Sequence, residues 1–156
     1  METVFSLPSF RENTPFDIHL QHFALLAPNE GELLLLARAL NKTSSDDVIL
    51  HLFTDNITPG ETATIASFTE PGAGFGYGSA TMTAGDWTMR ASAGVSLASG
   101  TQQSFVFTSG TVAVYGYFFT DGGGNDVLWC EEFSDGPYNI PSGGGTINVT
   151  PKIQLD

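Results

Sequence analysis

Acidic and amide side chains surround three consecutive glycines in the sequence DGGGND, which begins at Asp121, and such a composition is found in calcium-binding loops. Asp121, Asn125 and Glu132 occupy positions 1, 5 and 12 of an EF-hand loop. The other positions do not fit, because position 3 is Gly123 and position 6, which requires glycine, is Asp126. A phosphate-binding loop would need a Gly-Lys-Ser/Thr ending and a following helix. We therefore predict a β-hairpin turn here, with no metal and no cofactor.

Two acids and a thiol follow in the sequence LWCEEF. Glu131 and Glu132 are adjacent, so in a strand they point to opposite faces and cannot act as an acid/base pair across one substrate. Cys130 is the only cysteine, which excludes an intrachain disulfide. Alternation places Cys130 on one face with Leu128, and we expect a buried, inert thiol.

The histidines offer the remaining familiar ligand pattern. His19 and His22 form an H-x-x-H pair, and His51 lies in an expected strand. No cluster of cysteines or carboxylates completes a set of four zinc ligands around them. The sequence also contains neither the G-x-S-x-G motif of hydrolases nor the H-E-x-x-H motif of metalloproteases. An enzyme would have to assemble its site from scattered acids, and we predict that this protein is not an enzyme.

Aromatic residues are frequent, at 12% of the chain. Such side chains line the sugar grooves of β-sandwich carbohydrate binders, but they also fill sandwich cores. The sequence leaves both interpretations open for five of them: Tyr77, Trp87, Tyr115, Tyr117 and Trp129.

The charge of the chain excludes one class of ligand. Five Lys and Arg stand against seventeen Asp and Glu, a formal net charge of −12. Such a surface repels nucleic acids and anionic membranes, since binding to polyanions depends on cationic side chains. The first residues, METVFSLPSFRENTPFD, do not have the pattern of a secretory signal, and the apolar run LLLLARAL is too short to span a bilayer. We expect synthesis in the cytoplasm and no membrane association.

Two parts of the chain must position these residues. Residues 1–28 hold single apolar side chains without a sustained period, which indicates an extended N-terminal arm. Residues 29–156 form the expected domain. Its first segment, 28–42, has a capping-box-like pair in Asn29 and Glu32 and is expected to be the one short helix.

Beyond the helix, the apolar residues recur with period two, which is typical of strands. The short segments are separated by Gly-rich and Pro-containing joints, as in an all-β antiparallel β-sandwich, a jelly roll or a related Greek key. The expected strands are residues 47–55, 62–70, 75–83, 86–93, 103–109, 111–121, 126–133, 146–150 and a final KIQL.

The order of several motifs resembles a known family. PNEGELLLLARAL, LHLFTDNITPGETATIASFTEP, GDW, VYGYFFTDGGGNDVLWCEEFSDGPYNI and GGTINVTPKIQL follow one another in the chain. Together they resemble small β-rich proteins encoded among the structural genes of tailed phages, over residues 28–156. The resemblance implies a virion component, most consistent with capsid decoration, or cement, on the outside of the major capsid shell and often as trimers. It implies no catalytic residues.

From this resemblance we expect a non-enzymatic protein on the outer capsid surface of a virion, made in the host cytoplasm. Its expected partners are the major capsid protein and further copies of itself, as a homotrimer, with neither nucleic acid nor membrane. Four arm residues are the expected partner-binding anchors: Phe5, Leu7, Phe10 and Phe16. A tail- or fibre-associated virion protein, or a carbohydrate-binding β-sandwich module, is the alternative.

Overall fold

The structure is a computed structural model that describes residues 36–40, 42, 47–60, 62–92 and 95–155. Within these residues, 36–39 are α-helical, and the rest of the regular structure is strands and short 3-10 helices. The 3-10 helices are η1 (Ile65–Ser67), η2 (Ala73–Phe75) and η3 (Ala84–Asp86). The strands are β1 (Val48–Phe53), β2 (Ala80–Met82), β3 (Trp87–Ser92), β4 (Val95–Gly100), β5 (Gln103–Phe107), β6 (Val112–Val114), β7 (Gly116–Asp121), β8 (Val127–Glu132), β9 (Tyr138–Ile140), β10 (Gly145–Val149) and β11 (Lys152–Leu155).

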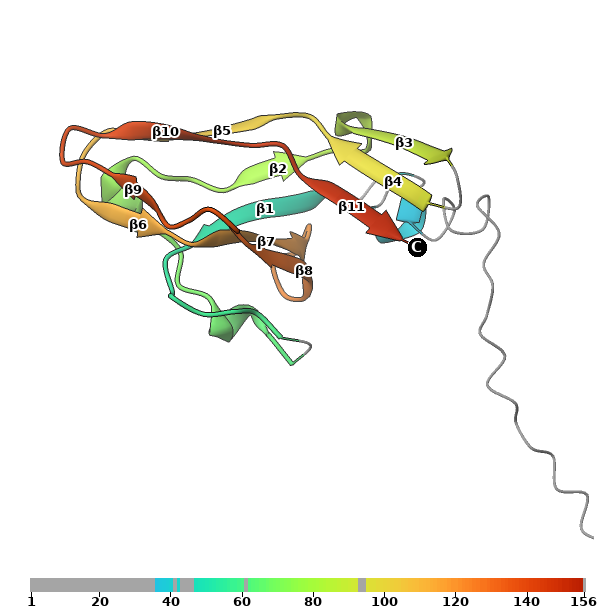
Figure 1. The fold of residues 1–156 in the computed structure, drawn as a ribbon, viewed down its shortest axis with the longest axis horizontal. Coiled ribbons are helices and arrows are strands. Elements are labelled where there is room, and N and C mark those ends of the chain that lie inside the picture. The colour runs from blue at the N-terminus through green and yellow to red at the C-terminus, as the bar shows by residue number, and fades with distance from the viewer. Residues whose placement is uncertain (1–35, 41, 43–46, 61, 93–94, 156) are drawn as a thin grey trace, which may run out of the picture.

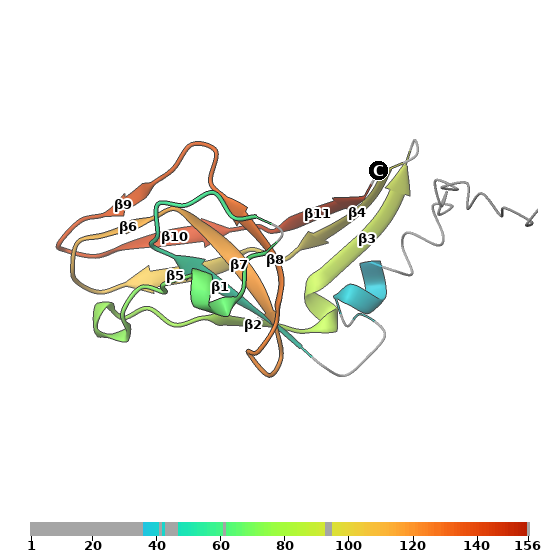
Figure 2. The same cartoon turned by 90° about the horizontal axis from the view of Figure 1, so that it is seen from below.

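These strands form an antiparallel β-sandwich. One layer is a four-stranded sheet of order β2-β1-β7-β8, and the facing layer contains the β10-β5 pair and the three-stranded sheet β11-β4-β3. Figure 1 shows β5 and β10 lying over β1, β7 and β8, and Figure 2 shows β3, β4 and β11 extending beyond them. The all-β sandwich predicted from the sequence is confirmed, while a jelly-roll connectivity stays a prediction.

The main core lies between the two layers. Leu50 and Phe119, on the central strands β1 and β7, are 0% exposed, and they belong to one cluster with Phe105 of β5 and Ile147 of β10. The burial alternates along β5 and β10, because only one face of that pair meets the core. β1 is buried on both faces, which explains its nearly continuous apolar sequence.

A second, smaller cluster covers the other face of the four-stranded sheet. Phe53 of β1 and Phe118 of β7 pack there against Phe68, which comes from the loop between β1 and β2. Figure 1 shows this loop, with η1, on the side of β1 and β7 away from β5 and β10. This loop therefore covers the outer face of the four-stranded sheet as a third layer. It buries Phe53 and Phe118, which would otherwise be exposed to solvent on that face.

The segment predicted as a strand over 62–70 is not a strand. It contains η1, where the Oγ of Ser67 accepts the N–H of Thr64 at 3.1 Å in a reciprocal capping arrangement. Phe68 is buried, while its neighbours on both sides are exposed. The Thr- and Ser-rich composition that suggested a strand thus supplies side-chain caps instead. The prediction over 75–83 is also too long, because only Ala80–Met82 pairs and Gly76 takes a left-handed φ of 85°.

The strand predicted over 111–121 divides at Tyr115. The Tyr115 N–H donates to the carbonyl of Phe53 at 2.9 Å, and β6 before it leaves the sheet to pair with β9. The strands β4 and β9 were not predicted. VSLASG of β4 has few large apolar residues and YNI of β9 is only three residues long, yet β4 pairs with both β3 and β11.

The helix predicted over 28–42 is described only from residue 36. Leu36 and Leu40 are buried in the main core, and the Nζ of Lys42 donates to the carbonyls of Ala84 and, at 2.8 Å, Trp87. The arm, residues 1–28, and its boundary with the domain lie outside the described residues. Among the residues that are described, no helix is long and apolar enough to cross a membrane.

Candidate functional site

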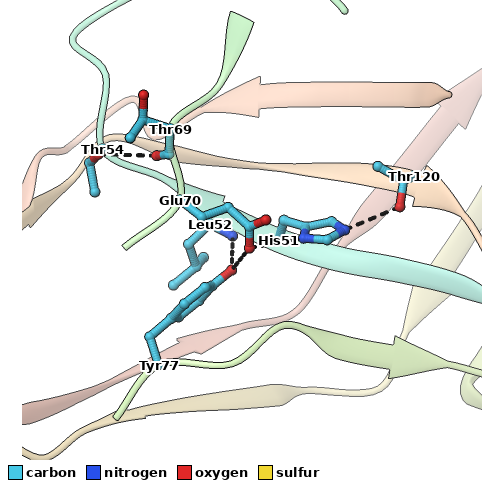
Figure 3. Close-up of polar contacts among 7 residues, drawn as sticks. All are labelled: His51, Leu52, Thr54, Thr69, Glu70, Tyr77 and Thr120. Atoms are coloured by element: carbon cyan, nitrogen blue, oxygen red, sulfur yellow. Dashed lines mark hydrogen bonds and ion pairs between the residues drawn. The ribbon is translucent and has the colours of Figure 1, made fainter. Parts of the chain in front are cut away.

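A carboxylate, an imidazole and a hydroxyl meet beneath the loop that carries η1 (Figure 3). Nδ1 of His51 lies 3.0 Å from Oε2 of Glu70, and Nε2 of the same ring lies 3.1 Å from Oγ1 of Thr120. His51 comes from β1, Thr120 from β7 and Glu70 from the loop. An acid, an imidazole and a hydroxyl in this order also form the catalytic triad of hydrolases. Whether a substrate can reach the hydroxyl therefore decides whether the group could be catalytic.

The geometry of this group is only partly that of a triad. Nδ1 of His51 approaches Glu70 closely, but the contact does not have the alignment of a hydrogen bond. The Glu70 carboxylate instead accepts a bond of 2.7 Å from the hydroxyl of Tyr77, which in turn accepts the Leu52 N–H at 2.9 Å. Figure 3 shows Oε2 of Glu70 between the tyrosine hydroxyl and the imidazole. Burial, and next to it the bond to Glu70, raise the pKa of Tyr77 although the Leu52 N–H opposes them.

Burial closes this group to any substrate. Thr120 is 0% exposed and His51 7% exposed, and the imidazole is stacked on Phe118 with ring centroids 4.7 Å apart. Phe118 is stacked in turn on Phe68 at 4.5 Å. A hydroxyl without access to solvent cannot attack a carbonyl, so the arrangement fastens the loop to β1 and β7. The polar group is only partly satisfied, because Nδ1 of His51 has no hydrogen-bond partner, and the Glu70 side chain at its edge is 38% exposed.

The glycine loop after β7 is a hairpin turn, as predicted. β7 and β8 pair antiparallel on either side of it, and Gly124 takes a left-handed φ of 71°. The Asp121 carboxylate accepts three backbone N–H groups, from Gly123 at 3.3 Å, Asn125 at 2.6 Å and Asp126 at 3.0 Å. These bonds lower the pKa of Asp121. The Asp121 carboxylate, which matched position 1 of a calcium loop, therefore already accepts hydrogen bonds from the backbone of its own turn.

The adjacent glutamates point to opposite faces of β8, as expected. The Tyr117 hydroxyl donates to Oε2 of Glu131 on one face, and the Thr58 hydroxyl donates to Oε2 of Glu132 at 2.9 Å on the other. Burial, and then the contact with Glu131, raise the pKa of Tyr117. No substrate can lie between these two carboxylates, because the strand itself separates them.

A β-bulge interrupts the simple alternation along β8 on which the pairing of Cys130 with Leu128 was based. The register between β7 and β8 shifts between Phe119 and Thr120. Cys130 packs with Val127 against the smaller cluster, while Leu128 is 37% exposed. The thiol is partly buried, where the sequence predicted a buried one, and this burial raises the pKa of Cys130.

The five aromatic residues considered as sugar-groove candidates belong to the two hydrophobic clusters. Tyr77, Trp87 and Tyr117 are buried members of the main core. Trp129 packs against it at 5.2 Å from Phe119, and Tyr115 packs against the smaller cluster. Tyr138 is not among these five candidates, and it is 39% exposed. Its position between Gly-Pro and an Asn-Ile pair gave no strand signal, and only β9 reveals it as a fixed surface residue.

Tyr138 stands at one wall of an open groove of about 820 Å³. The groove runs between β8, the last strand of the four-stranded sheet, and β10, which pairs with β5 alone in the described part of the chain. The buried side chains of Tyr117, Ile147 and Val149 form its floor. Polar side chains from several elements line the rest: Glu131, Asn139, Thr146, Asn148, Thr150 and Lys152.

Metal binding receives no support from the described residues, among which no group of three or more His, Cys, Asp or Glu side chains is placed to hold an ion. His51 is in the buried network, and His19 and His22 lie outside the described residues, as do the arm residues Phe5, Leu7, Phe10 and Phe16.

No protein-family model matches the chain, and neither a curated protein nor a solved structure matches it.

Proposed function

We propose that this protein is a non-enzymatic structural protein of a phage virion, a capsid decoration or cement protein that binds and stabilises the major capsid shell. The observation that carries the proposal is the outer face of the β5-β10 pair, which holds no charged side chain in a protein with a net charge of −12. Depletion of charge is a property of the centres of protein interfaces.

Four exposed side chains make up this face, which we call the neutral face: Ser104, Val106, Thr146 and Asn148. Val106 and Thr146 are cross-strand partners, and Val106 is 53% exposed. Ser104 and Asn148 are partners as well, and the serine hydroxyl donates to Oδ1 of Asn148 at 2.7 Å. This bond fixes two of the four side chains in advance, so less side-chain freedom is lost when a partner surface covers them.

The buried network supports a structural role over catalysis. Its hydroxyl, Thr120, is inaccessible, and its imidazole is buried and stacked on the ring of Phe118. These residues stiffen the sheet that lies behind the neutral face. A rigid sandwich with an uncharged face fits a protein that adds mechanical support to a shell.

The remaining parts of the proposal come from the sequence. The resemblance of residues 28–156 to small structural proteins of tailed phages suggests the outer capsid surface and a homotrimer. Phe5, Leu7, Phe10 and Phe16 are proposed to anchor the arm on the major capsid protein, adding buried area to that of the neutral face. The acidic charge of the chain keeps it from binding the packaged DNA.

The test is co-sedimentation of purified protein with shells assembled without it. Val106→Glu places a charge at the centre of the neutral face and should weaken shell binding at least about tenfold, because a charge without a partner is costly to bury. Leu128→Glu makes the same change at an exposed position on β8 and is the matched control. Deletion of residues 1–16 should also abolish binding. If wild-type protein ignores shells and sediments with tails, the head location is wrong.

A further inference from the structure

The groove beside Tyr138 has the composition of a ligand site, and it shares only Thr146 and Asn148 with the neutral face. Its volume of about 820 Å³ is within the range of small-molecule sites, roughly 300–1,000 Å³. It is bordered by two sheet edges, so its shape is set by strands and not by a single loop. We propose that this groove binds a neutral oligosaccharide, with the ring of Tyr138 as the stacking platform.

The ring of Tyr138 is exposed and yet fixed in orientation. Phe133 packs edge to face against it, with ring centroids 5.0 Å apart and an interplanar angle of 69°. The neighbouring Asp135 carboxylate raises the pKa of Tyr138. An aromatic ring packed against a neighbouring ring loses little freedom when a ligand covers its free face, which favours binding.

The carboxylate of Glu131 is also held in advance. The buried Tyr117 hydroxyl donates to Oε2 of Glu131, which leaves Oε1 to accept hydrogen bonds from a ligand. Asn139 and Asn148 line the same groove; the Asn139 amide offers donors and an acceptor, and the Asn148 amide, whose Oδ1 accepts the Ser104 hydroxyl, offers its N–H donors. Adjacent hydroxyl groups of a sugar ring both donate and accept, so they match carboxylate and amide groups placed side by side.

The same lining disfavours other occupants. A peptide strand requires pockets for its apolar side chains, but Ile140, Ile147 and Val149 are only 5%, 7% and 4% exposed and are already covered by the core. An anionic sugar would approach a strongly acidic protein, and Lys152 is the single cation in the lining. A neutral saccharide meets neither obstacle.

The experiment is a titration of the full chain, followed by two-dimensional amide NMR. The probes are maltotriose, cellotriose and the trimer of N-acetylglucosamine, with a sialylated trisaccharide and an extended alanine-rich peptide as comparisons. Saturable shifts confined to the groove, including the side-chain amides of Asn139 and Asn148, are expected with at least one neutral trisaccharide. Absence of saturable shifts with all three neutral sugars, or stronger binding of the sialylated sugar or the peptide, overturns the proposal.

Substitution of the platform makes the test specific. Tyr138→Ala should lower the affinity about tenfold or more, whereas Tyr138→Phe, which keeps the ring, should stay within about threefold of wild type. Tyr138 is exposed, so both variants are expected to fold, and thermal unfolding checks this. Equal affinity of Tyr138→Ala and wild type overturns the assignment of the platform. Val106→Glu should leave sugar binding unchanged, which separates this proposal from the proposed shell binding.

Discussion

Nε2 of His51 on β1 lies 3.1 Å from Oγ1 of Thr120 on β7, and both residues are buried (Figure 3). The contact joins residues 69 positions apart, in two strands whose own hydrogen bonds are already made. Together with Glu70 and Tyr77, it attaches a long loop to the centre of the sheet. A buried polar atom that loses its hydrogen-bond partner is costly, so the bond between His51 and Thr120 should contribute to stability.

Removal of the Thr120 hydroxyl should therefore destabilise the domain. Thr120→Val keeps the shape of the side chain but leaves Nε2 of His51 buried without a partner, and we expect a loss of roughly 1–3 kcal/mol in the free energy of unfolding. Urea unfolding followed by fluorescence measures it. Thr146→Val, at an exposed position of β10, is the matched control and should stay within about 0.5 kcal/mol of wild type. A Thr120→Val variant as stable as this control would show that the network contributes nothing.

Tyr77 stabilises the edge of β1 beyond the end of its pairing with β2. That pairing stops at Leu50, and the Tyr77 hydroxyl then accepts the N–H of Leu52 at 2.9 Å. Tyr77→Phe leaves this buried N–H without an acceptor and should cost roughly 1–3 kcal/mol, with faster hydrogen exchange at Leu52. Tyr138→Phe removes an exposed hydroxyl and serves as the control. Unchanged exchange at Leu52 in the Tyr77 variant would contradict this role.

The turn at Asp121 predicts a particular dependence of stability on pH. Three N–H groups favour the charged carboxylate, so the folded-state pKa lies below the unfolded one, and the stabilisation is present above the unfolded pKa. It is lost as the pH falls through the folded pKa. The stability difference between wild type and Asp121→Asn should be largest near neutral pH and shrink below about pH 4.

Chemical denaturation across pH 2–7 checks this prediction. Asp126→Asn removes one charge from the same loop without removing the acceptor of the three bonds, and it controls for net charge. The prediction is contradicted if the stability difference between wild type and Asp121→Asn stays constant down to pH 2 or grows on acidification.

Gly116 is required where β7 begins, because a side chain there has no space. A Cβ atom would lie 2.2 Å from the carbonyl oxygen of Glu131 and 2.5 Å from the ring of Phe53. Gly116→Ala should destabilise the domain by about 3 kcal/mol or more, since a backbone atom has to move. At Gly78 a Cβ would meet nothing within 4 Å, so Gly78→Ala is the control. Equal unfolding temperatures of the Gly116→Ala and Gly78→Ala variants would show that a side chain at position 116 is tolerated, against this prediction.

Local patterns in the sequence were sufficient for most of the strands. The apolar run at 47–55 and the hairpin around DGGGND depend on composition and turn residues that act over a few positions. β4 was not predicted, because its buried residues Ser96 and Ala98 are small or polar and do not form an alternating apolar pattern. The error over 62–70 had the opposite origin, since Thr64 and Ser67 cap a 3-10 turn and imitate a strand only in composition.

The site required information that no local pattern contains. The bulge near Trp129 interrupts the alternation along β8, and a one-residue insertion into a strand has no sequence signature of its own here. Glu70 and Thr120 reach His51 only because a loop folds back across two strands. The groove at Tyr138 likewise arises from β8, β9 and β10, whose edges meet only in the folded domain.

The most direct test of the proposed function is quantitative co-sedimentation of wild type, Val106→Glu and Leu128→Glu with shells assembled without the protein. The account predicts saturable, symmetric binding of wild type and Leu128→Glu, and binding of Val106→Glu that is weaker by at least about tenfold. Failure of the wild-type protein to bind shells would contradict the capsid role. Equal binding of all three proteins would contradict the assignment of the neutral face.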